Sequence, residues 1–246
     1  MSTRDHLPPI HLVVLAGGRS ARAQRGDSTA PKQFRYAGRR MLFLIPVQEL
    51  LAVPEVASLT VAVPDPWRAV ADMALDEARL DRPVHLAPAG PHRTASTWCA
   101  LQALARAEAP AADHLVAVHD AARPFASRHL LARLALAAAR HGGAVPGVAV
   151  PDTIVELTEG PAPETAGAAY LERERLQAVQ TPQVFRWDLL HAAHEWCAAQ
   201  ELQFTDDGGL LAERGRPPVV VMGEADNWKI TTESDWDRAE AILRRR

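Results

Sequence analysis

The sequence predicts a single α/β domain, residues 1–246, built on a doubly wound, mainly parallel β-sheet with a projecting β-arm. Apolar runs of strand length alternate with longer segments, rich in alanine and leucine, that have helical periodicity. The strand-like runs are continuously apolar, which is typical of strands that helices cover on both faces. One stretch, residues 144–175, breaks this alternation. The 246 residues, of which 48% are hydrophobic, suffice for one sizeable core.

The first half of the chain predicts four strands, each followed or preceded by a helix. We expect the strands at 10–16, 59–63, 83–87 and 115–119. The helices are expected at 41–51, 66–80, 94–108 and 127–141, the first of them interrupted by Pro46. Connections of this kind place a ligand beyond the carboxyl ends of the strands.

The second half begins with the irregular stretch 144–175, in which two β-rich pieces surround a loop of glycine, proline and alanine. We interpret it as an arm that leaves the sheet; the alternative is a surface hairpin without a role. Helices are then expected at 186–200 and 205–214, a strand at 217–222 and a final helix from residue 233.

Charge and cysteine content exclude several classes of protein. The net charge of -3, from 27 basic and 30 acidic residues, predicts no nucleic-acid or membrane surface, so an anionic substrate would need a local cationic cluster. Cys99 and Cys197 lie far apart, which argues against a disulfide framework and a cysteine zinc site. We find no signal peptide and no run of the roughly 20 apolar residues that a membrane helix needs, and predict a cytoplasmic protein.

The loop after the first strand is the first candidate site. Gly17 and Gly18 allow the backbone to approach a ligand closely and to direct amides at phosphate oxygens. Cationic side chains crowd the same loop, as a triphosphate would require: Arg19, Arg22, Arg25 and Lys32. The pattern is neither a Walker loop nor GxGxxG, and a solvated basic loop is the alternative.

Two further segments carry charged residues after strands. In VHDAARPF, Asp120 is placed to hold Mg²⁺ with a triphosphate, and Arg123 to pair with the phosphate of a second substrate. The alternative is a helix N-cap and an ordinary surface arginine. In ADNWKITT, Lys229 lies between two apolar side chains and Asp226 is a candidate second metal ligand, whereas a solvated lysine is the alternative.

These segments together resemble one family, the 2-C-methyl-D-erythritol 4-phosphate cytidylyltransferases; the related ribitol-5-phosphate cytidylyltransferases share much of the pattern. The resemblance covers about residues 12–243 and rests on AGG…R…PKQF, AGPHRTAS, HDAARP, VPDTIVEL, R…QTPQ, TDD and DNWKIT in this order. It implies a Rossmann-like nucleotidyltransferase fold. It also implies transfer of CMP from CTP to a sugar or polyol phosphate, chiefly 2-C-methyl-D-erythritol 4-phosphate, with Mg²⁺ and release of pyrophosphate in isoprenoid precursor synthesis.

The resemblance also implies a role for each matching residue. Arg22, Lys32 and Lys229 match catalytic cations around the triphosphate. The nucleotide-binding residues are Ala16, Gly17, Gly18, Gly90 and Ser96. The acceptor-binding residues are Asp120, Arg123, Thr153, Arg173 and Thr181. Thr153 and Arg173 lie in the arm, which in the family crosses to a partner subunit, so we expect a homodimer through residues 144–175.

The sequence departs from the family pattern near the base and the acceptor. Ser20 and Ala23 replace other residues in the first loop, and the stretch between Arg22 and Lys32 is longer than usual. Further departures are Ala89-Gly90-Pro91, Gln177 and Trp228. They leave a ribitol-5-phosphate or other polyol-phosphate cytidylyltransferase as an alternative. A catalytically inactive dimeric paralogue is a second alternative, against which the intact lysines and HDAARP motif argue.

Overall fold

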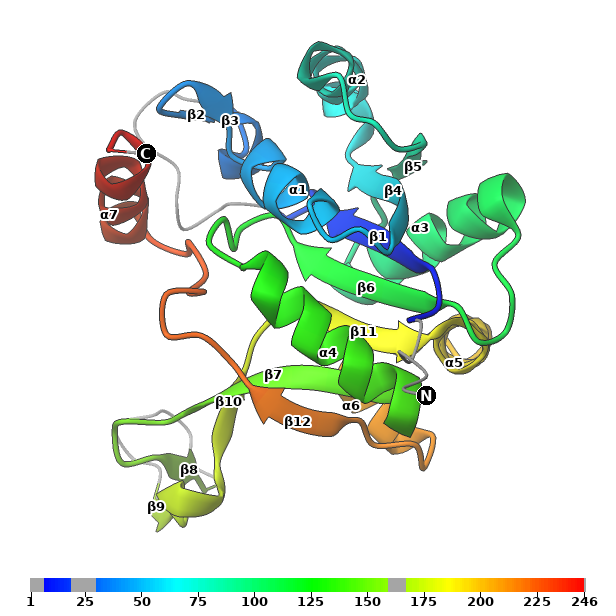
Figure 1. The fold of residues 1–246 in the computed structure, drawn as a ribbon. Helices are drawn as coiled ribbons and strands as arrows, with labels where there is room; N and C mark the ends of the chain where they lie inside the picture. Colours follow the sequence, from blue (N-terminus) through cyan, green and yellow to red (C-terminus); the bar gives the residue numbers. More distant parts are fainter. Residues whose placement is uncertain (1–6, 19–29, 159–166, 246) are drawn as a thin grey trace, which may run out of the picture.

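The computed structural model describes residues 7–18, 30–158 and 167–245, and its centre is an eight-stranded mixed sheet (Figure 1). The strand order is β10-β7-β11-β6-β1-β4-β5, and β12 also pairs with β7. Parallel pairing joins β1 (Ile10–Leu15), β4 (Val56–Val63), β5 (Val84–Pro88) and β6 (Leu115–Asp120). The mainly parallel sheet is therefore confirmed, with strands close to the expected positions.

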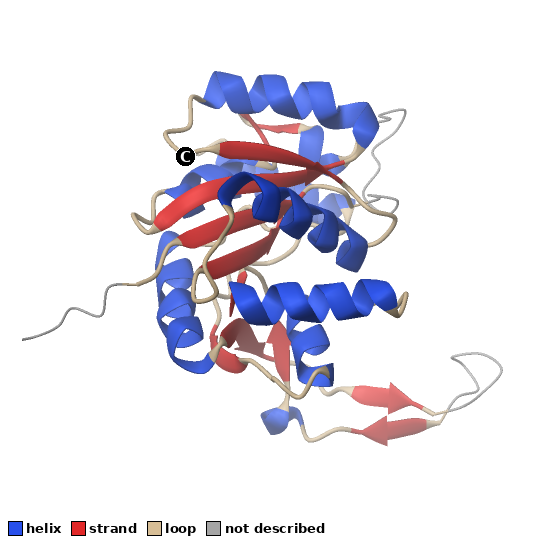
Figure 2. Ribbon diagram, turned by 90° about the vertical axis from the view of Figure 1, so that its right-hand side faces the viewer, coloured by secondary structure: helices blue, strands red, loops and turns tan. Residues whose placement is uncertain are grey.

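Helices cover both faces of this sheet (Figure 2). Because successive strand residues point to opposite faces, Leu12 and Val14 of β1 join one core and Val13 and Leu15 the other. The first core includes α1 (Leu44–Leu51), α2 (Arg68–Ala78) and α4 (Arg128–His141). The second includes α3 (Arg93–Glu108), α5 (Trp187–Ala199) and α6 (Asp207–Glu213). The doubly wound arrangement is thus confirmed.

A third, smaller core was not predicted. The C-terminal helix α7 (Glu233–Leu243) packs beside a short hairpin of β2 (Tyr36–Ala37) and β3 (Arg40–Met41) (Figure 1). Its buried members include Phe125, Ile230 and Trp236. Ile230 lies in the loop that follows β12, and Phe125 lies in the loop that follows β6, so this core fixes those loops relative to each other.

The prediction for residues 41–51 is wrong at its start. Met41 belongs to β3, and α1 begins at Leu44. Pro46 does not interrupt the helix because it is the third helical residue, where a backbone N–H would have no intrahelical partner anyway.

The boundaries predicted for the arm are also wrong. Residues 144–149 belong to β7 (Gly143–Ala149), a strand of the main sheet that is buried over its first five residues. It pairs in parallel with β12 (Val219–Met222) and antiparallel with β10 (Gln177–Val179) and β11 (Gln183–Arg186). Between β7 and β10, the exposed strands β8 (Val155–Leu157) and β9 (Ala168–Tyr170) form a separate hairpin that extends from the sheet (Figures 1 and 2).

Within the described residues, none of the helices combines the length and apolar character that a membrane crossing requires.

Candidate active site

A cavity of about 440 Å³ lies at the carboxyl ends of β1 and β6. This is the edge at which doubly wound sheets bind ligands. The loops after β1, β5, β6 and β12 all contribute to its wall. The residues that line it are Leu15, Gly17, Gly18, Lys32, Gln33, Gly90, Pro91, His92, Arg93, Ser96, Asp120, Ala122, Lys229 and Thr231.

The structure brings the predicted nucleotide-binding residues together. Gln33 Nε2 donates to the carbonyl oxygens of Ala16 (3.0 Å) and Gly18 (2.9 Å), which fixes the first loop. A Cβ on Gly17 would lie 2.6 Å from that of Ala89, so only glycine permits the first loop to approach the loop after β5 so closely. In that second loop, the N–H of Gly90 donates to Ser96 Oγ at 3.0 Å.

Lys32 lies in a short 3₁₀ turn, Lys32–Phe34, and is almost fully buried. Its Nζ donates to the carbonyl oxygen of Ile230, 198 residues away in the sequence. The PKQF and NWKIT segments therefore meet at one wall of the cavity. The third predicted catalytic cation, Arg22, lies outside the described residues, as do Arg19 and Arg25.

Asp120 is the last residue of β6 and connects two cations. Its Oδ2 accepts from Lys229 Nζ at 2.7 Å and its Oδ1 from Arg93 Nε at 3.2 Å. Burial alone would raise the pKa of Asp120, but the charges of Arg93 and Lys229 outweigh it and hold the pKa below its usual range. The N-cap alternative is wrong, because Ser127 caps α4 by accepting from the N–H of Leu130.

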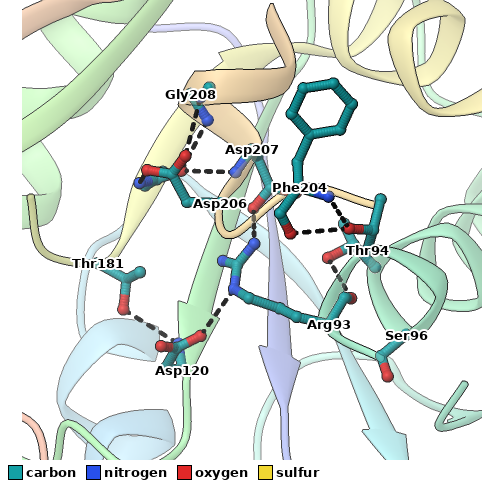
Figure 3. Close-up of polar contacts among 12 residues, drawn as sticks. Arg93, Thr94, Ser96, Asp120, Thr181, Phe204, Asp206, Asp207 and Gly208 are labelled. Carbon is teal, nitrogen blue, oxygen red and sulfur yellow. Dashed lines mark hydrogen bonds and ion pairs between the residues drawn. The ribbon is translucent and has the colours of Figure 1, made fainter. Parts of the chain in front are cut away.

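The contact between Arg93 and a second buried carboxylate was not foreseen. Arg93 Nη1 donates to Asp207 Oδ2 at 2.8 Å, so the guanidinium lies between Asp207 and Asp120 (Figure 3). His194 Nε2 lies 2.9 Å from the other oxygen of Asp207. Burial raises the pKa of Asp207, but Arg93 and His194 outweigh it and lower the pKa to about 2. The TDD motif carried this residue, although its sequence position indicated no partner.

Another signal could have strengthened the prediction. The chain contains only two lysines among its 27 lysine and arginine residues, and both line the cavity. Elsewhere the chain uses arginine as its cation. Both lysine side chains, each ending in a compact, strongly hydrated ammonium, thus lie where the sequence predicted phosphate groups.

The acceptor-binding residues form two separate groups. Near the cavity, Thr181 Oγ1 accepts from the N–H of Asp120 at 3.0 Å, and Arg123 Nη1 donates to the carbonyl oxygen of Asn227 at 2.8 Å. Thr153 and Arg173 lie instead on the exposed segment between β7 and β10, where Arg173 Nη1 donates to the carbonyl oxygen of Pro151 at 2.9 Å. Neither of these two residues lines the cavity of the same chain.

The structure does not bring Asp226, the second predicted metal ligand, to the cavity that Asp120 lines. Asp226 is exposed and borders a different hollow, together with Phe125, Glu224 and Trp228. Across the ranges 7–18, 30–158 and 167–245, no group of three His, Cys, Asp or Glu side chains is placed to hold a metal. Asp120 is the one acidic residue among the described residues that line the cavity.

Comparisons with known proteins agree with this geometry. The family model described as IspD: 2-C-methyl-D-erythritol 4-phosphate cytidylyltransferase matches residues 10–245. The 2-C-methyl-D-erythritol 4-phosphate cytidylyltransferase of Geobacillus kaustophilus is 34% identical over 94% of this chain and 95% of its own. The bifunctional enzyme IspD/IspF of Nitrobacter winogradskyi is 35% identical over 94% of this chain, which spans about half (55%) of that relative.

The fold is also found in solved structures. The crystal structure of 4-diphosphocytidyl-2C-methyl-D-erythritol synthase from Anaerococcus prevotii superimposes with a TM-score of 0.80 at 25% identity, over 96% of each chain.

Proposed function

The chain belongs to the 2-C-methyl-D-erythritol 4-phosphate cytidylyltransferase family, and on that premise we propose that it transfers the cytidylyl group of CTP to 2-C-methyl-D-erythritol 4-phosphate. One observation carries the proposal to this chain's own residues. The cavity combines a glycine loop with both lysines of the sequence and the ion pairs of Asp120. Backbone amides and ammonium groups at the carboxyl edge of a sheet suit a triphosphate.

The nucleotide lies with its phosphates between the two lysines. The loop at Gly17 and Gly18 approaches the phosphates with its backbone, while Lys32 and Lys229 neutralise their charge. Gly90, in the loop after β5, and Ser96, in the first turn of α3, line the same cavity beside the first loop, and we place the base against them. Arg22 joins these cations on the evidence of the sequence motif alone.

The reaction needs no covalent enzyme intermediate. An oxygen of the acceptor phosphate attacks the α-phosphorus of CTP and forms a new P–O bond. The bond between that phosphorus and the bridging oxygen breaks, and pyrophosphate leaves with the electron pair. A phosphate monoester is already anionic near neutral pH, so no strong general base is required. The barrier is then charge crowding and orientation, which Lys32 and Lys229 reduce by stabilising charge on the phosphate oxygens.

We also propose Mg²⁺ as the cofactor, with Asp120 as its protein ligand. Mg²⁺ at nucleotide sites is bound by one or two carboxylates together with substrate phosphates and waters, so a single carboxylate on the cavity wall fits. When bound, the ion would neutralise phosphate charge beyond what the lysines supply. Pyrophosphate release should cease in excess chelator and return on addition of Mg²⁺; undiminished release in chelator would refute the metal requirement.

The arm supports a homodimer with shared sites. Both strands of the β8–β9 hairpin are exposed, and Leu157 and Tyr170 are 56% and 77% accessible. An isolated hairpin is marginal in water, so we propose that it packs on a partner subunit and delivers Thr153 and Arg173 to the partner's acceptor site. The two free cysteines support the placing of the enzyme in the cytoplasm.

The test of the activity is pyrophosphate release from CTP with a panel of acceptors. We expect release with 2-C-methyl-D-erythritol 4-phosphate and little with ribitol 5-phosphate or glycerol 3-phosphate. A preference for ribitol 5-phosphate would assign the polyol alternative. Failure with every acceptor would assign the inactive paralogue.

A further inference from the structure

Among the contacts of the described residues, Arg93 alone connects the cavity to the buried carboxylate of Asp207. It is the first residue of α3, and it lines the cavity, whereas Asp207 does not. The shorter of its two ion pairs, 2.8 Å, is to Asp207, and the longer, 3.2 Å, is to Asp120 (Figure 3). Its remaining nitrogen, Nη2, is buried without a hydrogen-bond partner in the described part of the chain. The two carboxylates therefore anchor the guanidinium.

Asp207 itself is rigidly held. Its side chain is 1% exposed, and its N–H and that of Gly208 both donate to Gln183 Oε1, at 3.1 and 3.0 Å. His194 lies against its second oxygen. Thr94 and Phe204 exchange two hydrogen bonds, 2.9 and 3.0 Å, and so tie the start of α3 to the loop before α6. Asp207 is thus a fixed anion for Arg93 that does not itself line the cavity.

The position of the Asp207 carboxylate determines how the two oxygens of Asp120 are divided between Arg93 and Lys229. Asp120 has two oxygens, and its shorter ion pair, 2.7 Å, is with Lys229. The planar fork of a guanidinium binds one carboxylate with two parallel bonds when nothing else holds it. If Asp207 were neutral, Arg93 would turn fully to Asp120 and compete with Lys229.

From this geometry we infer that Asp207 is a positioning residue for the proposed reaction: by holding Arg93, it keeps Asp120 paired with Lys229 at the cavity. The inference rests on the proposed function for its kinetic consequence, although not for the pairing itself. It therefore has one test that needs no activity and one that does.

The pairing can be observed directly because the chain has only two lysines. With ¹³Cε-labelled lysine, the protein gives one side-chain NMR signal for Lys32 and one for Lys229, which a Lys229→Gln variant assigns. In Asp207→Asn, the Lys229 signal should move toward that of a solvated lysine and the Lys32 signal should not. Asp206→Asn is the matched control, because Asp206 caps α6 and bonds Gln183 but does not contact Arg93. An unchanged Lys229 signal in Asp207→Asn, or an equal change in Asp206→Asn, would overturn the inference.

The kinetic test is a double-mutant cycle. Asp207→Asn should lower kcat about tenfold, and Asp206→Asn by less than about twofold. In the Lys229→Gln background, Asp207→Asn should lower kcat by less than about threefold more, because the pair that it disturbs is already lost. A full tenfold loss in that background would show a merely structural role. Wild-type turnover is measured first: its absence refutes the proposed function, and the NMR result still decides the positioning role.

The cycle remains usable if Asp207→Asn does not fold. Asp207→Glu then takes its place, because it keeps the charge but displaces the carboxylate from Arg93 by one methylene. The same loss of kcat in the wild-type background, and its absence beside Lys229→Gln, are expected. Equal losses in both backgrounds would overturn the inference.

Discussion

Lys32 and Lys229 reach the cavity from opposite ends of the sequence and are held in different ways. Lys32 is buried and donates to a backbone carbonyl, whereas the side chain of Lys229 is 41% exposed and pairs with Asp120. A buried ammonium with a fixed partner is pre-oriented, and a half-exposed one can adjust to a bound ligand. The two lysines therefore suit different phosphate oxygens of one triphosphate.

Replacing either lysine with alanine should lower kcat by roughly 10²-fold or more, since the proposed function assigns both lysines to charge that develops in the transition state. The measurement is steady-state pyrophosphate release, with circular dichroism to verify the fold. Arg186→Ala is a suitable control. Arg186 of β11 pairs with Asp188 and lies beside Leu115, at the end of β6 that is remote from the cavity. A lysine variant that keeps most of its kcat would show that this lysine does not stabilise the transition state.

His119, next to Asp120, couples stability to pH. It is fully buried, with Nε2 3.0 Å from the carbonyl oxygen of Arg123 and Nδ1 3.1 Å from Thr181 Oγ1. Burial lowers the pKa of His119 to about 4. Between that value and the unfolded value near 6.5, the unfolded chain binds a proton that the folded chain does not, so stability must fall as the pH decreases.

We expect the free energy of unfolding to fall by up to about 3 kcal/mol from this group between pH 6.5 and pH 4. In His119→Gln, whose amide can still donate to the carbonyl oxygen of Arg123, this part of the dependence should disappear. Urea denaturation at a series of pH values measures it, with His129→Gln, a change at an exposed histidine of α4, as control. Identical pH dependences of His119→Gln and the wild type would contradict the assignment.

Among the elements, the loop between β12 and α7 contains two adjacent residues of which one is buried and the other is exposed. Asn227 is fully buried, and its Nδ2 donates to the carbonyl oxygen of Thr181 at 2.8 Å. The backbone carbonyl oxygen of Asn227 accepts a hydrogen bond from Arg123 Nη1. Asp226, one residue earlier, is exposed. Asn227 therefore joins this loop to the segment between β10 and β11.

Asn227→Ala should destabilise the protein by about 1–3 kcal/mol, because it leaves the buried carbonyl of Thr181 without its donor. Asp226→Ala should change the free energy of unfolding by less than about 0.5 kcal/mol and leave the Mg²⁺ dependence of turnover intact. Thermal or urea unfolding of the two variants makes the comparison. Loss of metal dependence in Asp226→Ala would restore Asp226 as a ligand.

The elements that the sequence predicted correctly are those with local signals. Long periodic helices and fully apolar strands carry their pattern within one segment, as β1 and α4 do. Pro146 and Gly147 interrupt the apolar run of β7, so the local pattern does not separate this strand from the arm that follows it. β10 and β11, of three and four residues, depend on partners far away in the chain.

At the site too, residues in local motifs were predicted and contacts between distant segments were not. Motifs placed the glycine loop, both lysines and Asp120 correctly at one cavity. Its proximity to Lys229 in the sequence does not bring Asp226 to this cavity, because consecutive loop residues can point in different directions. The contact between Arg93 and Asp207 spans 114 residues, and no spacing rule relates them.

For the whole molecule, the proposed homodimer predicts that two inactive variants complement each other. A subunit with Arg173→Ala mixed with one carrying Arg123→Ala should recover activity, although we expect each variant homodimer to be inactive. In the mixed dimer, one of the two sites retains both arginines if the arm acts in trans. Arg175→Ala is the matched control, because Arg175 lies on the same exposed turn and pairs only with Glu172 among the contacts that the structure describes. A mixture that stays inactive after confirmed subunit exchange would show that the arm acts within its own chain.

The insertion of β11 between β6 and β7 also dictates an order of assembly. β6 ends at residue 120 and β7 begins at residue 143, yet the strand that joins them in the sheet spans residues 183–186. During synthesis, the first four parallel strands can pair before β11 exists, and β6 then has one edge without a neighbour. Such an edge can pair with another chain. Val184 and Phe185 of β11 belong to the two cores on opposite faces of the sheet, so neither core can be complete until about three quarters of the polypeptide has been made. Until then, this edge of β6 is the place where the nascent chain is open to pairing with another chain.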